Sequence, residues 1–246
     1  MVKVRSYERP LSLDEVLAMV RGEDTILIGG GTGLHLRDHP EPVRVVDLQA
    51  AGLGGIQRDE DGTLRIGATT TLQQLADDDH VPSVVREAAR REAPSTLRTL
   101  ATLGGCVATA DSESELLAAL LAYDATVTTA ASGETHLDPL TDVLRNLQRE
   151  PGILRKRVIT AITIETSGVA SATRVGRTPA DRAIVAAVAR RTPAGELRLA
   201  LTGVAPTPIL VPDGDHLDPT GDFRGSSEYR RALAATLSSR ALEALR

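Results

Sequence analysis

This 246-residue chain contains two glycine clusters whose composition and spacing could form a ligand-binding site. The first is Gly29-Gly30-Gly31-Thr32-Gly33, and the second is Thr102-Leu103-Gly104-Gly105. Because glycine has no Cβ, its backbone reaches positive φ and can turn consecutive N–H groups toward one point, where an anionic phosphate fits. The first cluster lacks the lysine of a P-loop and has Leu34 where the Rossmann spacing needs glycine. Such a loop, taken alone, is more often a structural turn than a phosphate site. Two clusters together predict a pair of concave sites that could clasp one diphosphate.

An acidic run follows the second cluster, from Ala110 through Asp111 to Glu115. Its hydroxyl and carboxylate groups could bond a polyol such as a ribityl chain. The run also suits a helix N-terminus, where carboxylates are stabilised by the positive end of the helix dipole. Both interpretations can hold together.

Other kinds of chemistry find little support in the sequence. Cys106 is the single cysteine, so it cannot form an internal disulfide or hold an iron–sulfur cluster, which needs about four thiolates. Any such cluster is expected on another chain. The closest histidine pair, His35 and His39, lies in a stretch broken by Pro40, and we expect no metal site there. No Ser-His-Asp or paired-carboxylate arrangement indicates acid–base catalysis.

Charge and hydropathy restrict the partners and the location. The net charge is −5 and the isoelectric point is near 5.6, so the cationic surface of a nucleic-acid-binding protein is missing. The first residues lack the apolar region of a signal peptide, and no apolar run approaches the ~20 residues of a membrane span. We expect a cytoplasmic protein.

The elements that position the glycine clusters follow from apolar periodicity and capping residues. The expected strands are 25–28, 43–48, 64–67, 125–130, 158–166 and 197–204; the expected helices are 12–20, 70–75, 81–91, 113–121, 183–189 and 229–245. Ser12 is the predicted cap of the first helix and Gly22 its end, and Thr71 or Ser83 cap later helices. Ser132-Gly133 marks a hairpin turn. Strand 25–28 runs directly into the first cluster, and the leucine stripe of helix 113–121 indicates core packing.

Further motifs occur in order along the chain. They are Arg65–Thr71 (RIGATTT), Ala110–Leu116 (ADSESEL), Arg174–Val185, Thr202–Pro208 (TGVAPTP) and Phe223–Arg231 (FRGSSEYRR). With the two glycine clusters, they resemble the FAD-binding, medium-size subunit of the xanthine dehydrogenase and carbon monoxide dehydrogenase group of molybdenum hydroxylases. The resemblance spans nearly the whole chain, and the order of the matches makes coincidence improbable.

The resemblance implies FAD as the cofactor and assigns residues to it. The implied FAD-binding residues are Gly29, Gly30, Gly31, Thr32, Gly33, Leu34, Thr102, Leu103, Gly104, Gly105, Cys106, Ala110, Asp111, Glu115 and Arg174. The two clusters would hold the diphosphate, and Glu115 would meet the ribityl or adenosine hydroxyls. The chain departs from the family at Cys106, where Asn or Ser is usual, and at Thr99, where Asn is frequent. Glu115 replaces the usual Asp, and Arg174 a common Lys.

The same resemblance implies the fold and the division of labour. The fold is α+β: a PCMH-type FAD-binding domain over 1–168, with subdomains of about 1–54 and 55–168, then a small carbon monoxide dehydrogenase flavoprotein-like domain over 169–246. A molybdenum-cofactor large subunit would oxidise the substrate, and a 2Fe-2S small subunit would pass electrons to FAD, which reduces NAD, a quinone or oxygen. Two alternatives stay open: a free-standing flavoenzyme, and a related module that has lost FAD.

Overall fold

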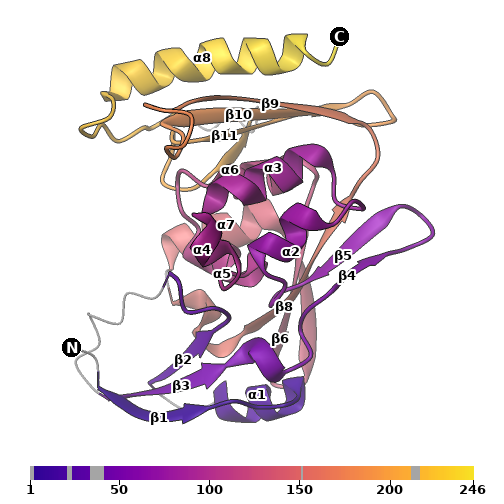
Figure 1. Cartoon of the computed structure of the whole chain (residues 1–246), viewed down its shortest axis with the longest axis vertical. Coiled ribbons are helices and arrows are strands. Elements are labelled where there is room, and N and C mark those ends of the chain that lie inside the picture. The colour runs from indigo at the N-terminus through magenta and orange to yellow at the C-terminus, as the bar shows by residue number, and fades with distance from the viewer. Residues whose placement is uncertain (1–2, 21–23, 34–41, 151, 212–216) are drawn as a thin grey trace.

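The computed structural model describes residues 3–20, 24–33, 42–150, 152–211 and 217–246. Three sheets and two layers of helices are stacked along the long axis of the molecule (Figure 1). The mixture of parallel and antiparallel sheets with packed helices is the α+β class that the sequence predicts. None of the described helices combines the length and the apolar character of a membrane span.

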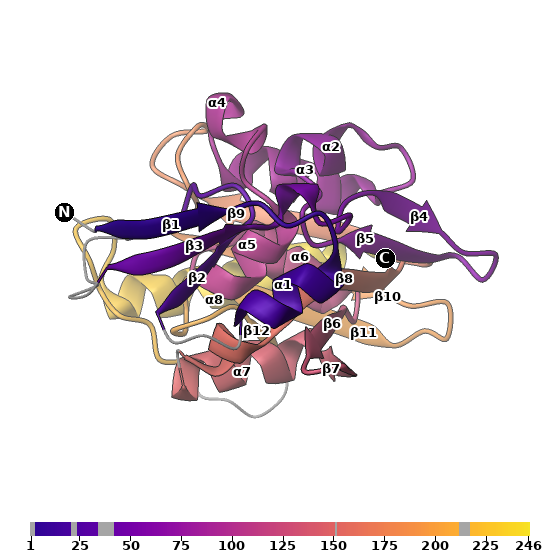
Figure 2. The ribbon, with the colours of Figure 1, turned by 90° about the horizontal axis from the view of Figure 1, so that it is seen from below.

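The N-terminal sheet is parallel and has the order β1-β3-β2. Its strands are β1 (Val4–Glu8), β2 (Thr25–Ile28) and β3 (Val43–Asp47). Helix α1 (Leu13–Val20) lies beside these strands and packs Val16 and Val20 against Val46 (Figure 2). Parallel strands place their carboxyl ends at one edge of a sheet, so β2 delivers the first glycine cluster to that edge.

The central sheet is antiparallel, with the order β4-β5-β8-β6-β7. Its strands are β4 (Ile56–Arg58), β5 (Thr63–Gly67), β6 (Thr126–Ala131), β7 (Glu134–Pro139) and β8 (Val158–Glu165). The predicted hairpin turn is confirmed, since Ser132 and Gly133 connect β6 to β7 with φ angles of 50° and 90°. Two positive φ angles in succession match the right-handed twist of the flanking strands.

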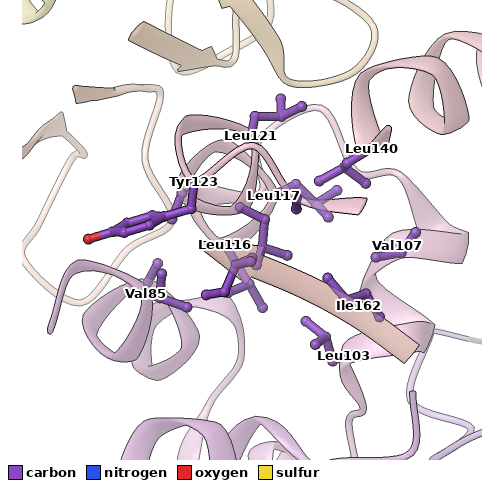
Figure 3. Packing of buried hydrophobic residues seen from close by; sticks show 14 of the residues in the cluster. Val85, Leu103, Val107, Leu116, Leu117, Leu121, Tyr123, Leu140 and Ile162 are labelled. Atoms are coloured by element: carbon purple, nitrogen blue, oxygen red, sulfur yellow. The ribbon is translucent and has the colours of Figure 1, made fainter. Parts of the chain in front are cut away.

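A helical layer covers the central sheet. Its helices are α2 (Leu72–Asp77), α3 (Ser83–Glu92), α4 (Ser95–Arg98), α5 (Leu103–Thr109), α6 (Glu115–Ala122) and α7 (Leu140–Arg149). Helix α6 lies at its centre, and all eight of its residues are buried. Figure 3 shows Leu116 and Leu117 of α6 among Leu103 and Val107 of α5 and Ile162 of β8. The predicted core role of the leucine stripe is therefore confirmed.

The C-terminal sheet is antiparallel and lies between two helical layers (Figure 1). Its strands are β9 (Val169–Val175), β10 (Val185–Arg191), β11 (Leu197–Thr202) and β12 (Ile209–Val211). One face meets α6, and the long helix α8 (Ser227–Glu243) covers the other. Strand β11 and helix α8 confirm the predicted strand 197–204 and terminal helix 229–245 within two residues.

The predicted helix 183–189 is wrong, because this segment forms the central strand β10. Ala187 and Ala189 pack toward α8, while Val188 packs into the core that includes α6. A strand buried on both faces reads as a continuous apolar run, which periodicity cannot distinguish from a buried helix. Tertiary burial here overrides the helix propensity of alanine.

Most of the predicted caps are found in the structure. Ser12 accepts a hydrogen bond from the Glu15 amide at 3.3 Å, and Thr71 forms a full capping box with Gln74. Ser83 does not cap: it is the first residue of α3, after Pro82. Gly22, Leu34, His35 and His39 lie outside the described residues.

Candidate functional site

Two cavities adjoin where the glycine clusters meet. The larger, about 660 Å³, is lined by Gly29–Gly33, α4 and its flanks, α5, Asp111 and Arg182. The smaller, about 360 Å³, is lined mainly by β2, Ala68, Leu147, Leu154, Arg157 and Ile159. The cavities share Ile26, Leu27, Gly29, Thr102, Gly105 and Ala108. An elongated ligand could therefore extend from one cavity into the other past these shared residues.

The first glycine cluster offers backbone donors to the larger cavity. The amides of Gly30 through Gly33 donate no hydrogen bond to any described residue, and Gly31 has a φ of 69°. A Cβ on Gly30 would lie 1.7 Å from the carbonyl oxygen of Leu100. This glycine therefore allows the loop to pass directly against the segment before the second cluster. The arrangement has the unpaired N–H groups and positive φ of an anion-binding nest.

The second cluster is not such a nest, and that prediction is wrong. Thr102 caps helix α5, whose first turn contains Gly104 and Gly105, and neither glycine has positive φ. The amides of Leu103 and Gly104 donate to the carbonyls of Thr70 and Ala68 at 3.0 and 2.8 Å. The Gly105 amide donates to the Thr102 hydroxyl at 3.3 Å. These glycines instead permit close packing, since a Cβ on Gly104 would lie 2.8 Å from that of Ala68.

One end of the larger cavity is strongly polar. Arg182 pairs with Asp111 at 2.8 Å and approaches Glu92 at 3.9 Å. Burial alone would raise the pKa of Asp111, but hydrogen bonds from Arg182 and from the Glu113 amide bring it below its ordinary value. Burial raises the pKa of Glu92 despite the opposing effects of Arg182 and Ser114. A cation and an ionised carboxylate therefore face this end together.

Cys106 lines the larger cavity, and its thiol is expected to be unreactive. Burial, reinforced by the nearby Glu92 carboxyl, raises its pKa well above the ordinary value. Since the thiolate is the nucleophile, we expect Ellman's reagent at pH 8 to label the folded chain at least about tenfold more slowly than the urea-unfolded chain. Equal labelling rates would contradict this assignment.

The carboxylates of the acidic run form ion pairs with arginines of the C-terminal part of the chain. Asp111 pairs with Arg182, and Glu115 pairs with Arg174 at 2.9 Å. Glu113, between them, pairs with Arg224 and, at 3.3 Å, with Arg230. The run is thus the strip along which the C-terminal sheet and α8 are attached to α6, with Ser114 as the N-cap of α6.

Several residues assigned by resemblance lie away from the cavities. Glu115 and Arg174 bind each other and line neither cavity, and Leu103 is buried in the core. Ala110 ends α5 in the left-handed conformation. The remaining described residues of the set, which are Gly29, Gly30, Gly31, Thr32, Gly33, Thr102, Gly104, Gly105, Cys106 and Asp111, all line one cavity or both.

The sequence interpretation missed Arg182, Glu92 and Arg157, which also line the cavities. Arg182 belongs to the same matched motif as Arg174. The motif therefore indicates arginines near the site, but it does not indicate which of them lines the cavity. Glu92 and Arg157 lie outside every motif that the sequence offered.

Comparisons with known proteins agree with this architecture. The family described as the FAD binding domain in molybdopterin dehydrogenase matches residues 2–165. Protein YgfM of Escherichia coli (strain K12) is 28% identical over 256 residues, covering 95% of this chain and 93% of that protein. The carbon monoxide dehydrogenase medium chain of Afipia carboxidovorans is 27% identical over 275 residues, covering 96% and 95%. The xanthine dehydrogenase FAD-binding subunit of Escherichia coli O157:H7 is 33% identical over 129 residues, 49% of this chain and 44% of that protein.

Solved structures share the fold. Reconstituted CO dehydrogenase from Oligotropha carboxidovorans superposes with a TM-score of 0.87 at 24% identity, covering 100% of this chain and 98% of that one. Quinoline 2-oxidoreductase from Pseudomonas putida 86 gives a TM-score of 0.87 at 23% identity with the same coverage. The predicted fold class is therefore confirmed. The family match covers well over half of the sequence, and the chain is therefore an oxidoreductase subunit whose cofactor is FAD. It belongs to the FAD-binding subunits of molybdopterin dehydrogenases.

Proposed function

We propose that this chain relays electrons within a molybdenum hydroxylase complex. A large subunit with the molybdenum cofactor oxidises the substrate, and a 2Fe-2S subunit delivers the electrons to this chain. NAD, a quinone or oxygen then removes them. A bound flavin supplies the conversion between single-electron exchange with clusters and two-electron exchange with an acceptor. Family membership and the carbon monoxide dehydrogenase medium chain among its relatives support this assembly.

The pair of adjoining cavities is the observation that carries the placement of FAD. FAD is elongated, with a ring system at each end and a diphosphate between them. Gly30–Gly33 lie beside the wall that both cavities share, and their amides donate to no acceptor in the described part of the chain, so these amides hold the diphosphate. Thr102 and Gly105, at the start of α5, also line both cavities. Small ligands bury most of their surface in pockets of ~300–1,000 Å³, and both cavities lie in that range.

The larger cavity suits the isoalloxazine ring, and the smaller suits the adenine. Leu147, Leu154 and Ile159 give the smaller cavity an apolar wall against which a base can lie. In the larger cavity, Arg182 is a fixed cation held by Asp111. A preorganised positive charge stabilises negative charge that develops beside it. Arg182 thus favours the reduced flavin, and Thr32 and Thr109 offer hydroxyls along the wall.

Replacing Arg182 with methionine is expected to lower the reduction potential of the bound flavin. The change removes the cation and leaves the Asp111 carboxylate unbalanced, so both effects disfavour the reduced form. We expect a drop on the order of 30 mV, about 1.4 kcal/mol for a two-electron couple, measured by anaerobic titration with a redox dye. Arg182→Lys, which keeps the charge, is the control. An unchanged potential in Arg182→Met would place the flavin elsewhere.

We divide the chain into an FAD-binding domain over 1–168 and a C-terminal domain over 169–246. The separate C-terminal sheet, which begins with β9 at Val169, supports this boundary. In this division Glu115 and Arg174 attach the two domains and do not touch the cofactor.

Purification decides between the proposed relay and its alternatives. We expect the chain produced alone to be yellow with one FAD, and the chain produced with its partners to yield a complex containing molybdenum and iron. A colourless protein that rejects added FAD would indicate a module that has lost the cofactor. A yellow protein that binds no partner and oxidises an organic substrate by itself would indicate a free-standing flavoenzyme.

A further inference from the structure

An exposed aromatic side chain stands out in a chain that has few. The sequence contains one phenylalanine and three tyrosines. The only phenylalanine, Phe223, is 86% exposed, and Tyr229, six residues later, is 45% exposed. Hydrophobic stabilisation is proportional to the area removed from water, so Phe223 adds little to folding in the isolated chain.

The backbone around Phe223 is fixed by many hydrogen bonds. Asp222 and Gly225 exchange backbone hydrogen bonds of 3.0 and 3.2 Å, with Phe223 and Arg224 at the tip between them. The Asp222 carboxylate accepts from the amides of Arg224 and Gly225 at 2.8 and 3.1 Å and pairs with the buried Arg230 at 3.0 Å. An exposed aromatic ring on an ordered turn is preorganised for binding, because little backbone entropy is lost when a partner arrives.

Two guanidinium groups flank the ring. Arg177 lies 6.0 Å and Arg224 lies 5.8 Å from the ring centroid. Arg224 is committed to Glu113 and Asp222, whereas Arg177 is exposed and forms no ion pair within the described parts of the chain. The loop that carries Arg177 is tethered where Arg174 donates to the carbonyls of Pro179 and Asp181.

The same loop continues to the flavin site. Arg182, five residues after Arg177, lines the larger cavity and pairs there with Asp111. Figure 1 shows the loop between β9 and β10 and the turn before α8 at the same end of the C-terminal sheet. Arg224, next to Phe223, pairs with Glu113, two positions after the cavity-lining Asp111. Phe223 and Arg177 thus lie at the end of the C-terminal sheet from which Arg182 reaches the larger cavity.

The shape of this site favours a protein over a small molecule. Small-molecule sites are concave, and Phe223 lines neither of the two cavities. Protein interfaces are anchored by aromatic and arginine side chains that enter pockets of the partner. Scattered exposed apolar residues need no explanation, but an ordered aromatic with two flanking arginines has the composition of such an anchor.

We propose that Phe223 and Arg177 are the docking anchor for the iron–sulfur subunit. The iron–sulfur subunit presents an apolar pocket to Phe223 and a carboxylate to Arg177. The iron–sulfur subunit is the partner chosen because it must bring its cluster near the flavin, and the loop that carries Arg177 continues to Arg182 in the larger cavity. This inference rests on the proposed function.

The test measures the affinity of the FAD-loaded chain for the purified 2Fe-2S subunit by calorimetric titration. Phe223→Ala and Arg177→Glu are each expected to raise the Kd at least about tenfold, as loss of an interface anchor does. Leu137→Ala is the matched control, because Leu137 is 68% exposed on β7 of another sheet, and its Kd should stay within about twofold of wild type. FAD content and melting temperature should be unchanged in all three variants.

The outcomes separate this inference from the proposed function. If the wild-type chain binds FAD but not the 2Fe-2S subunit, both the electron relay and the anchor are overturned. If the wild type binds the subunit and Phe223→Ala and Arg177→Glu bind it equally well, the anchor alone is overturned. If Leu137→Ala weakens binding as much as Phe223→Ala, the contact lies elsewhere and the anchor is again overturned.

Discussion

Replacing Gly30 with alanine is expected to deprive the chain of FAD while leaving it folded. The added Cβ would lie 1.7 Å from the Leu100 carbonyl oxygen, whereas real Cβ atoms essentially never lie closer than 3.0 Å to such an atom. The loop must therefore move by about 1 Å, and the amides of Gly30–Gly33 move with it. Misplacing a binding group by about 1 Å can reduce its effect on the order of 100-fold, and we expect FAD affinity to fall by about that factor. Fluorescence titration of the apoprotein with FAD measures the change.

Gly133→Ala is the control for this experiment. Gly133 has a φ of 90° in the β6–β7 hairpin and lines neither cavity. Alanine there introduces backbone strain of ~1 kcal/mol and should lower stability without changing FAD affinity. Gly30 has no positive φ and contacts the segment before α5, so its variant should lose FAD affinity, whereas Gly133→Ala should keep it. Full FAD affinity in Gly30→Ala would remove the first glycine cluster from the cofactor site.

Replacing Arg230 with methionine is expected to cause the largest loss of stability. This side chain is only 3% exposed and donates to the carbonyls of Ile184 and Gly203 at 2.7 and 3.1 Å. It also pairs with Glu113 and Asp222. Its removal leaves the two carbonyls without this donor and each carboxylate with Arg224 as its remaining arginine. Removing one partner from a buried ion pair costs about 3–5 kcal/mol. Urea denaturation should report a decrease of that size in the free energy of unfolding.

Arg231→Met provides the comparison, because Arg231 is the next residue of α8 and is exposed. Exposed substitutions usually change the free energy of unfolding by no more than ~0.5 kcal/mol. If both variants lose the same amount, the buried Arg230 network does not hold α8 to the acidic run, and the attachment of the C-terminal sheet must be explained otherwise.

Local signals predicted much of the fold. The strand Thr25–Ile28 leading into glycines, the cap at Thr71 and the hairpin at Ser132-Gly133 each depend on residues close together in the chain. Strand β10 was mistaken for a helix because its identity depends on α6 and α8 covering it from both sides. That information lies in packing between distant segments, which periodicity does not contain.

The sequence predicts which glycine clusters line the candidate site, but only partly how their backbone amides are used. Both glycine clusters line the cavities, yet the amides of α5 are already bonded to Thr70, Ala68 and Thr102. The sequence could not reveal this, because Thr70 and Ala68 lie more than thirty positions before those amides. Similarly, the family resemblance assigns both Glu115 and Arg174 to the cofactor, and the structure shows that these two residues, 59 positions apart, form an ion pair with each other. Long-range partners decide which polar groups remain available for a ligand.

Amide hydrogen exchange with and without FAD tests the central claim most directly, because it reports the protection of individual backbone segments. We predict that one equivalent of FAD slows exchange at Gly30–Gly33, whose amides have no hydrogen-bond acceptor among the residues that the structure describes. Exchange at Leu103–Cys106 should change little, since those amides already have partners. Protection that appears at Leu103–Cys106 and not at Gly30–Gly33 would contradict the account, because the diphosphate would then lie on α5 and not on the first glycine cluster.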